Sequence, residues 1–208
     1  MSIPDRSQAA SLYLSLDPPP WHLRHSRAVA EIAAWLALRA QQAGRSLDRH
    51  LVESAALLHD VDKLPAVKPE VAGLRHADGS AEWLTRHGLA ELAPVVASHP
   101  VTRLADGDWF EAWFPTATTE ALLVSYADKR AGQNLEPMAG RFASWKRRYP
   151  PEERKLKSGD SWSAATVEAV WRRSLAIEAR VCELAGGAPP DVLRLRWTDL
   201  ALRRARGA

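Results

Sequence analysis

The chain has 208 residues, which fits one domain with or without a helical extension and is long enough to bury a core. Its single cysteine, Cys182, excludes an intrachain disulfide and a cysteine-based zinc site, and it favours a reducing compartment. The first twenty residues lack a signal-peptide pattern, and no eighteen apolar residues occur in succession. We therefore expect a cytoplasmic protein without a membrane span.

The formal net charge of +3 is unevenly distributed. Residues 1–145 hold 14 Lys and Arg against 17 Asp and Glu, whereas residues 146–208 hold 14 against 8. Such a basic end can attract nucleic acid, but an arginine-rich solvated helical surface is the simpler interpretation. Nucleic-acid binding therefore stays the weaker alternative, and a homodimer is left open.

Abundant Ala, Leu and Arg, together with sparse β-branched residues, predict an all-α fold. Pro18-Pro19-Pro20 cannot continue a helix, so residues 1–20 are expected to be a lead-in to a domain over residues 21–150. Residues 151–208 are expected to form a helical extension packed on that domain. Apolar spacing and capping residues predict one helix from Asp48 to the His59-Asp60 pair, and others at about 21–43, 80–87, 89–98, 118–131, 137–148, 163–185 and 191–205.

A short aromatic helix is expected within RLADGDWFEAWFP. Its four aromatic residues could cover the pocket, stack a base or fill the core, and core packing is the preferred interpretation. They are Trp109, Phe110, Trp113 and Phe114.

Five polar residues fall where the helical pattern requires apolar side chains: His25, His59, Asp60, His99 and Asp128. A buried carboxylate is costly unless it is paired or bound to a cation, and His and Asp together are suitable ligands for a divalent metal. Each residue alone is weak evidence, because chance gives about 0.4 His-Asp dipeptides in a chain of this composition. Only the five residues taken together indicate a metal site.

The chain reads WHLRHSRAVAEIA around His25, ESAALLHDVDKLP around the His-Asp pair, and ALLVSYADKRAG around Asp128. In this order, over about residues 21–149, it resembles the HD superfamily of metal-dependent phosphohydrolases. The resemblance implies an HD-type helical bundle and a site for one divalent ion, which is Mn, Fe, Co, Ni, Mg or Zn. The implied ligands are His25, His59, Asp60 and Asp128.

Two further histidines, His76 and His99, stand where some branches of the family bind a second metal. The resemblance therefore implies a second ion there, with Asp60 bridging the two. Pro100 follows His99, whereas some two-metal branches carry another histidine at that place. His22 lies one turn before His25 and is expected to line the substrate pocket or to cap the helix.

Basic residues beside the implied ligands are expected to clamp the phosphate: Lys63, Lys129 and Arg130. Their alternative role is that of solvated residues at helix ends. Asp60, Lys63 and Lys129 are the residues expected to take part in catalysis.

Asp62 departs from the family, which commonly has a small residue at that position. Three roles are open for its side chain: it crowds the site, it orients a ligand histidine, or it pairs with Lys63.

The implied chemistry is hydrolysis of a nucleotide or another small phosphate ester by metal-activated water. The Gly-Tyr-Pro motif of the cyclic-dinucleotide phosphodiesterase branch is absent. One alternative is an HD-type di-iron oxygenase, which strict dependence on iron and oxygen would reveal. The other is a non-catalytic metal-binding or nucleotide-binding sensor, which would bind nucleotide tightly without turnover.

Overall fold

The computed structural model describes residues 3–151, 161–189, 194 and 196–207. Every regular element within these ranges is a helix, apart from an isolated bridge between Ala131 and Leu135, so the predicted all-α fold is confirmed. None of the helices described combines the length and apolar character that crossing a membrane requires. The α-helices are α1 (Arg6–Ser15), α2 (Pro20–Gln42), α3 (Arg49–Leu58), α4 (Asp78–Arg86), α5 (Ala93–Ala97), α6 (Gly107–Trp113), α7 (Thr119–Arg130), α8 (Met138–Arg148), α9 (Ala164–Ala185) and α10 (Trp197–Ala205).

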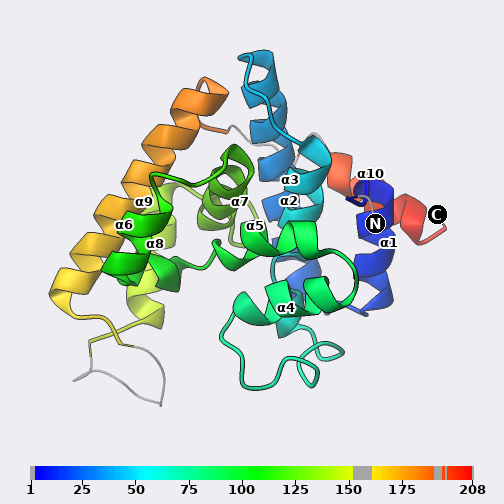
Figure 1. Ribbon diagram of the computed structural model, residues 1–208, viewed down its shortest axis with the longest axis horizontal. Coiled ribbons are helices and arrows are strands. Elements are labelled where there is room, and N and C mark those ends of the chain that lie inside the picture. The colour runs from blue at the N-terminus through cyan, green and yellow to red at the C-terminus, as the bar shows by residue number, and fades with distance from the viewer. Residues whose placement is uncertain (1–2, 152–160, 190–193, 195, 208) are drawn as a thin grey trace.

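Helices α2, α3 and α7 pack against one another in the middle of the molecule (Figure 1). Their apolar faces supply much of the core, including the fully buried Val29, Ile32 and Leu36 of α2. Helix α3 begins at the predicted cap, where the side chain of Asp48 accepts a hydrogen bond from the backbone N–H of Leu51. It ends one residue before His59, so the His-Asp pair lies at a helix end as predicted.

The predicted helix at 89–98 is divided in two. A 3₁₀ turn, η2 (Ala90–Leu92), precedes the five residues of α5. Pro94 stands at the start of α5, where a residue without a backbone N–H is tolerated, and α5 therefore begins only there. Two further 3₁₀ turns, η1 (Val61–Lys63) and η3 (Val101–Ala105), follow the His-Asp pair and Pro100.

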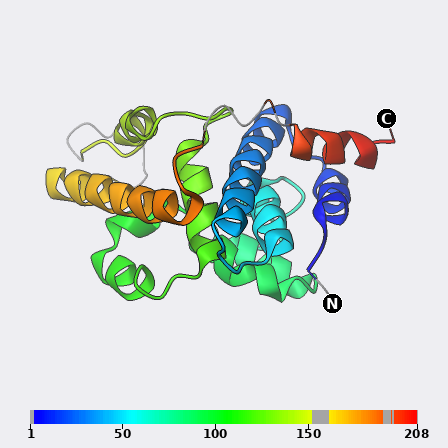
Figure 2. The same cartoon turned by 90° about the horizontal axis from the view of Figure 1, so that it is seen from above.

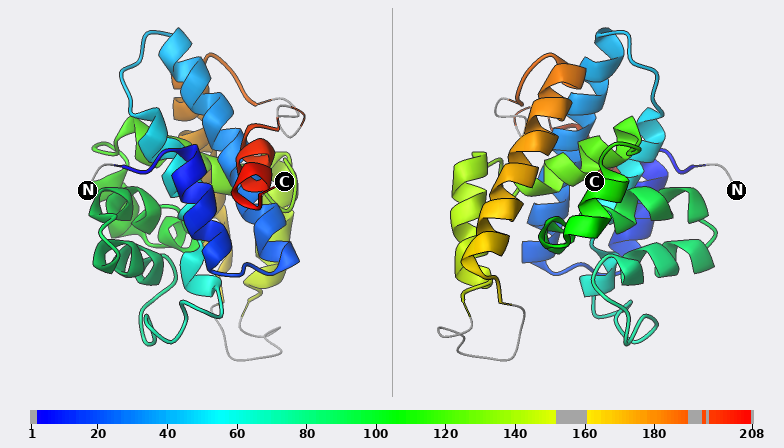
Figure 3. Two further views of the ribbon diagram at one scale, coloured as in Figure 1. Left: turned by 90° about the vertical axis from the view of Figure 1, so that its right-hand side faces the viewer. Right: turned by 60° about the vertical axis from the view of Figure 1, so that its left-hand side comes forward.

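The prediction that residues 1–20 form a lead-in is wrong, because α1 is part of the folded core. Its first turn is closed by a capping box in which Asp5 and Gln8 exchange hydrogen bonds. Ala10 and Tyr13 are fully buried, and α1 packs against α3 and α10. Figure 3 shows α1 and α10 beside each other, in front of α2. Pro18-Pro19-Pro20 therefore separates two packed helices.

The C-terminal helices contact different parts of this core. Helix α9 packs against α2, α7 and η3, and α10 packs against α1 and α2, so the two lie at opposite ends of the molecule (Figure 2). The aromatic rings of α6 stack in pairs, Trp109 on Trp113 and Phe110 on Phe114, and pack on the core. Of the last predicted helix, residues 190–193 and 195 lie outside the described residues.

Candidate metal centre

Six side chains from separate elements converge between α2, α3 and α7. The His-Asp pair directly follows α3, and the other four residues lie within α2, before α4, after α5 and within α7. They are His25, His59, Asp60, His76, His99 and Asp128. Within the described part of the chain, three overlapping groups bring potential ligand atoms within 4.8 Å of one another: His25, His59 and Asp128; His59, Asp60 and His99; and Asp60, Asp62 and His76.

The four imidazoles share one orientation. Each Nδ1 faces an oxygen that only accepts hydrogen bonds, so each Nδ1 carries the proton and donates it. The acceptors are the carbonyl oxygens of Gly132 for His25 (2.7 Å), Ala56 for His59 (2.8 Å) and Val96 for His99 (2.6 Å), and the Asp62 carboxylate for His76 (2.9 Å). In the neutral rings every Nε2 therefore carries a lone pair, which is the form that binds metals.

The Nε2 atoms meet in two pairs. Those of His25 and His59 lie 3.2 Å apart, and those of His76 and His99 lie 3.3 Å apart. Two lone pairs at this separation repel unless a cation or a proton lies near them. Bonds of about 2.1 Å from one ion, at tetrahedral or right angles, separate two ligand nitrogens by about 3.0–3.4 Å. Both distances therefore fit two ligands of one ion.

The two carboxylates complete the set. Oδ2 of Asp60 lies 3.4 Å from Nε2 of His25, and Oδ1 lies 3.3 Å from Nε2 of both His76 and His99. Oδ1 of Asp128 lies 3.4 Å from Nε2 of His25. Oδ1 of Asp60 is buried and has no hydrogen-bond partner among the described residues. An unsatisfied carboxylate oxygen is costly, so this atom fits a bound cation.

The electrostatics of the centre keep two histidines neutral and both carboxylates ionised, and they favour a positive charge beside His25. Burial lowers the pKa of His59 to about 3 and also lowers that of His99, so both rings are neutral. Burial alone would raise the pKa of Asp60, but the surrounding imidazoles and the ammonium of Lys63 outweigh it and hold the carboxyl ionised. At His25 burial is outweighed by Asp128 and Asp60, which raise its pKa to about 10. The carboxylates therefore demand a positive charge here.

The expectation that His22 lines the substrate pocket is wrong, because the ring is fully buried. Its Nε2–H donates to the backbone carbonyl of Asp60 (2.9 Å), and its Nδ1 accepts from the hydroxyl of Tyr13 (2.6 Å). The same Asp60 carbonyl accepts the backbone N–H of Lys63 (3.0 Å). His22 therefore holds the backbone from which the Asp60 carboxylate projects.

Asp62 orients His76. Besides the Nδ1–H of His76, its carboxylate accepts the backbone N–H of Ala77 (2.8 Å), a residue with the unusual φ of 69°. A Cβ at Gly79 would lie 3.1 Å from Cβ of Asp62, so this glycine provides the space for the larger residue. Of the roles left open for Asp62, the geometry supports the orientation of a ligand histidine.

Two of the expected phosphate clamps point away from the centre. Lys129 is fully buried, and its ammonium donates to the carbonyl of His99 (2.9 Å) and the hydroxyl of Ser125 (2.8 Å). Arg130 donates to the carbonyl of Glu136 and to the hydroxyl of Tyr126. The expectation that these residues contact substrate is therefore wrong. By contrast, the side chain of Lys63 is 35% exposed, and its Nζ lies 2.7 Å from Oδ2 of Asp60.

A cavity of about 360 Å³ opens over the six-residue cluster. His25, Asp60, His76 and Asp128 line it together with Lys63. Its other walls carry residues that sequence analysis did not single out, notably Arg141, Arg148, Trp21, Trp145 and Tyr149. Four of these belong to α8 or its end, and nothing in the local sequence indicates that this helix faces the cavity.

Comparison with known proteins gives one match. The family model described as HD domain matches residues 23–132, which is more than half of the chain and includes all six residues of the cluster. No curated protein matches the chain. No solved structure matches it either.

Asp62→Asn tests how His76 is held. The amide keeps an oxygen for the N–H of Ala77 but loses the charge that fixes the Nδ1–H tautomer of His76. We expect the affinity for Mn²⁺, measured by equilibrium dialysis, to fall by about 10-fold to 100-fold. Asp78→Asn is the matched control, because that carboxylate pairs with Arg103 and contacts no histidine. Equal losses in both variants would contradict the assigned role.

Proposed function

The chain belongs to the HD domain family, and on that premise we propose that it is a metal-dependent phosphohydrolase acting on a nucleotide or another small phosphate ester. The observation that carries the proposal is the position of the inward-facing histidine and aspartate cluster, which opens into a cavity bordered by Lys63, Arg141 and Arg148. Metal ligands and cations in one cavity suit an anionic substrate.

The proposed ligands form two sets that share Asp60. Nε2 of His25 and of His59, Oδ2 of Asp60 and Oδ1 of Asp128 would hold one divalent ion. Nε2 of His76, Nε2 of His99 and Oδ1 of Asp60 would hold a second. When bound, such ions lower the pKa of water and offset the charge of a phosphoryl group.

The cavity walls supply the remaining functions. Arg141 has a buried Nε without a partner among the described residues, and it lies on the wall that α8 forms. Lys63 stays protonated because Asp60 outweighs the effect of burial and raises its pKa. Both cations can bind phosphoryl oxygens. Trp21, which is 47% exposed, and Tyr149 offer apolar surface for the body of the ester.

The direct test combines metal analysis with a panel of nucleotides and phosphoesters, assayed without oxygen and with added Mn, Co or Mg. We expect bound divalent metal and release of inorganic phosphate, and Asp60→Ala should lose both. Full activity in Asp60→Ala would contradict the ligand assignment. Turnover only with iron and oxygen would indicate an oxygenase, and tight nucleotide binding without turnover under any metal would indicate a sensor.

Neighbouring arginines of α8 test the binding wall. Arg148 lines the cavity, whereas Arg147 donates to Ser144 on the same helix and lines no part of it. We expect Arg148→Ala to raise KM about tenfold with little change in kcat, because one charge-assisted contact is lost. Arg147→Ala should leave both constants unchanged. Equal effects of the two substitutions would exclude a specific contact at Arg148.

A further inference from the structure

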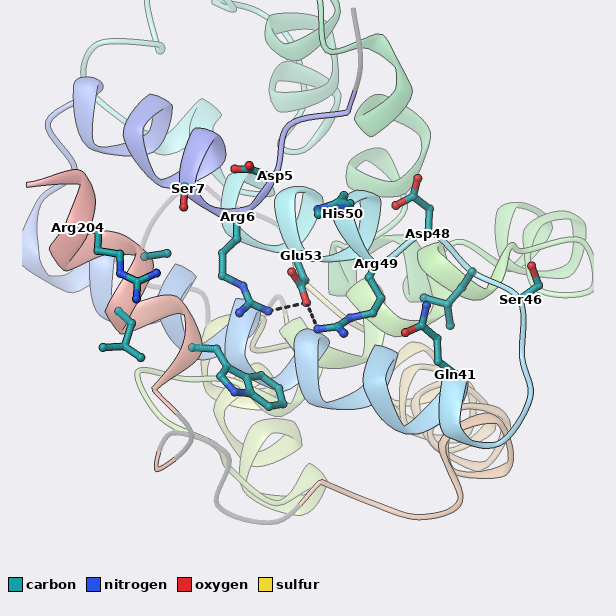
Figure 4. A pocket seen from close by; sticks show the side chains of 14 residues that line it. Asp5, Arg6, Ser7, Gln41, Ser46, Asp48, Arg49, His50, Glu53 and Arg204 are labelled. Atoms are coloured by element: carbon teal, nitrogen blue, oxygen red, sulfur yellow. Dashed lines mark hydrogen bonds and ion pairs between the residues drawn. The ribbon is translucent and has the colours of Figure 1, made fainter.

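A second large cavity lies away from the metal centre. It is an open groove of about 1000 Å³ between α1, α10, the start of α3 and the end of α2 (Figure 4). None of the residues that line it also lines the cavity over the metal centre. Two of its walls, α1 and α10, lie outside the segment that the HD domain model matches.

One carboxylate in this groove serves two guanidinium groups. Nη2 of Arg6 lies 2.6 Å and Nη2 of Arg49 lies 2.9 Å from the same oxygen of Glu53, as the dashed lines in Figure 4 show. The Nε atoms of both arginines are buried and have no hydrogen-bond partner in the described part of the chain. The cluster therefore keeps a surplus positive charge and unused donors.

Two helix N-termini face the same space. Arg6 begins α1 and Arg49 begins α3, so the positive ends of both helix dipoles border the groove. The other two acidic residues of the lining, Asp5 and Asp48, cap these helices. On the α10 wall, the side chain of Arg204 makes no hydrogen bond or ion pair with the other described residues. The lining thus holds three arginines against three carboxylates, and the two helix N-termini add partial positive charge, so a ligand anion meets a small positive excess.

The groove also offers apolar surface. The guanidinium of Arg6 lies 5.7 Å from the centre of the Trp197 ring, which belongs to the lining. Leu200, one turn further along α10, is 47% exposed and also lines the groove. An exposed leucine beside a tryptophan and three arginines suits a ligand that is both apolar and anionic.

We propose that this groove binds a small organic anion that joins a planar ring to one anionic group. The ring packs on Trp197 and Leu200, and the anionic group binds Arg204 beside the guanidinium groups of Arg6 and Arg49. Cavities up to this size hold small organic ligands. This ligand is distinct from the ester bound over the metal centre.

The test follows the indole N–H signals of ¹⁵N-labelled protein by NMR while 2-naphthalenesulfonate is added. Trp197→Phe identifies the Trp197 signal. We expect that signal to shift in a saturable way. If only other indole signals shift, including those of Trp21 or Trp145 in the metal-centre cavity, or if none shifts, the proposal is overturned.

Two neighbouring substitutions on α10 provide the specificity test. Arg204→Gln should weaken binding of the sulfonate about tenfold, because it removes one charge-assisted contact. Arg203→Gln is the matched control, since Arg203 pairs with Asp199 and does not line the groove. The affinity of this variant for the sulfonate should stay within about twofold of that of the unsubstituted protein. If both substitutions weakened binding equally, the loss of affinity would come from the change in net charge, and the assigned site would be wrong.

Discussion

The structure depends on positive charge that offsets two negatively charged carboxylates, Asp60 and Asp128, which lie among imidazoles at the centre of the fold. Asp60 is 1% exposed, and one of its oxygens has no hydrogen-bond partner in the described residues. A protein tolerates such a group only where positive charge offsets the loss of water. Four Nε2 atoms face the same carboxylates, and a bound cation would satisfy both kinds of atom together. The packing of α2, α3 and α7 is what brings these groups within reach.

Hydrogen bonds around the cluster fix the direction of each ring. Backbone carbonyls hold three of the histidines, and Asp62 holds the fourth. Tyr13 bonds His22, and His22 bonds the backbone of Asp60, although both residues precede the segment that the HD domain model matches. Helix α1 therefore supports the candidate centre as well as the core. Lys129 acts in the same supporting way, through the carbonyl of His99.

The helices were predictable from apolar spacing and capping residues. Five residues of the cluster stand out because they are polar at apolar positions, whereas His76 was implied only by the resemblance to the HD superfamily. The direction in which each side chain points was harder to predict. Consecutive residues of an α-helix point about 100° apart, so Lys129 and Arg130 turn away from the cavity that Asp128 faces. His22 lies one turn before His25 but bonds the Asp60 backbone. The cavity residues of α8 were missed because only tertiary packing brings them near Asp60. Helix α1 was missed because its three buried residues, Ala9, Ala10 and Tyr13, make too weak a pattern.

Anomalous diffraction at the manganese edge, from crystals grown with Mn²⁺, is the most direct test of the proposed metal centre. We expect two anomalous peaks beside Asp60, one contacting Nε2 of His25 and of His59, and the other contacting Nε2 of His76 and of His99. A single peak at the first position would exclude the second ion. No peak within bonding distance of Asp60, from crystals that bind manganese elsewhere or not at all, would contradict the proposed metal centre itself.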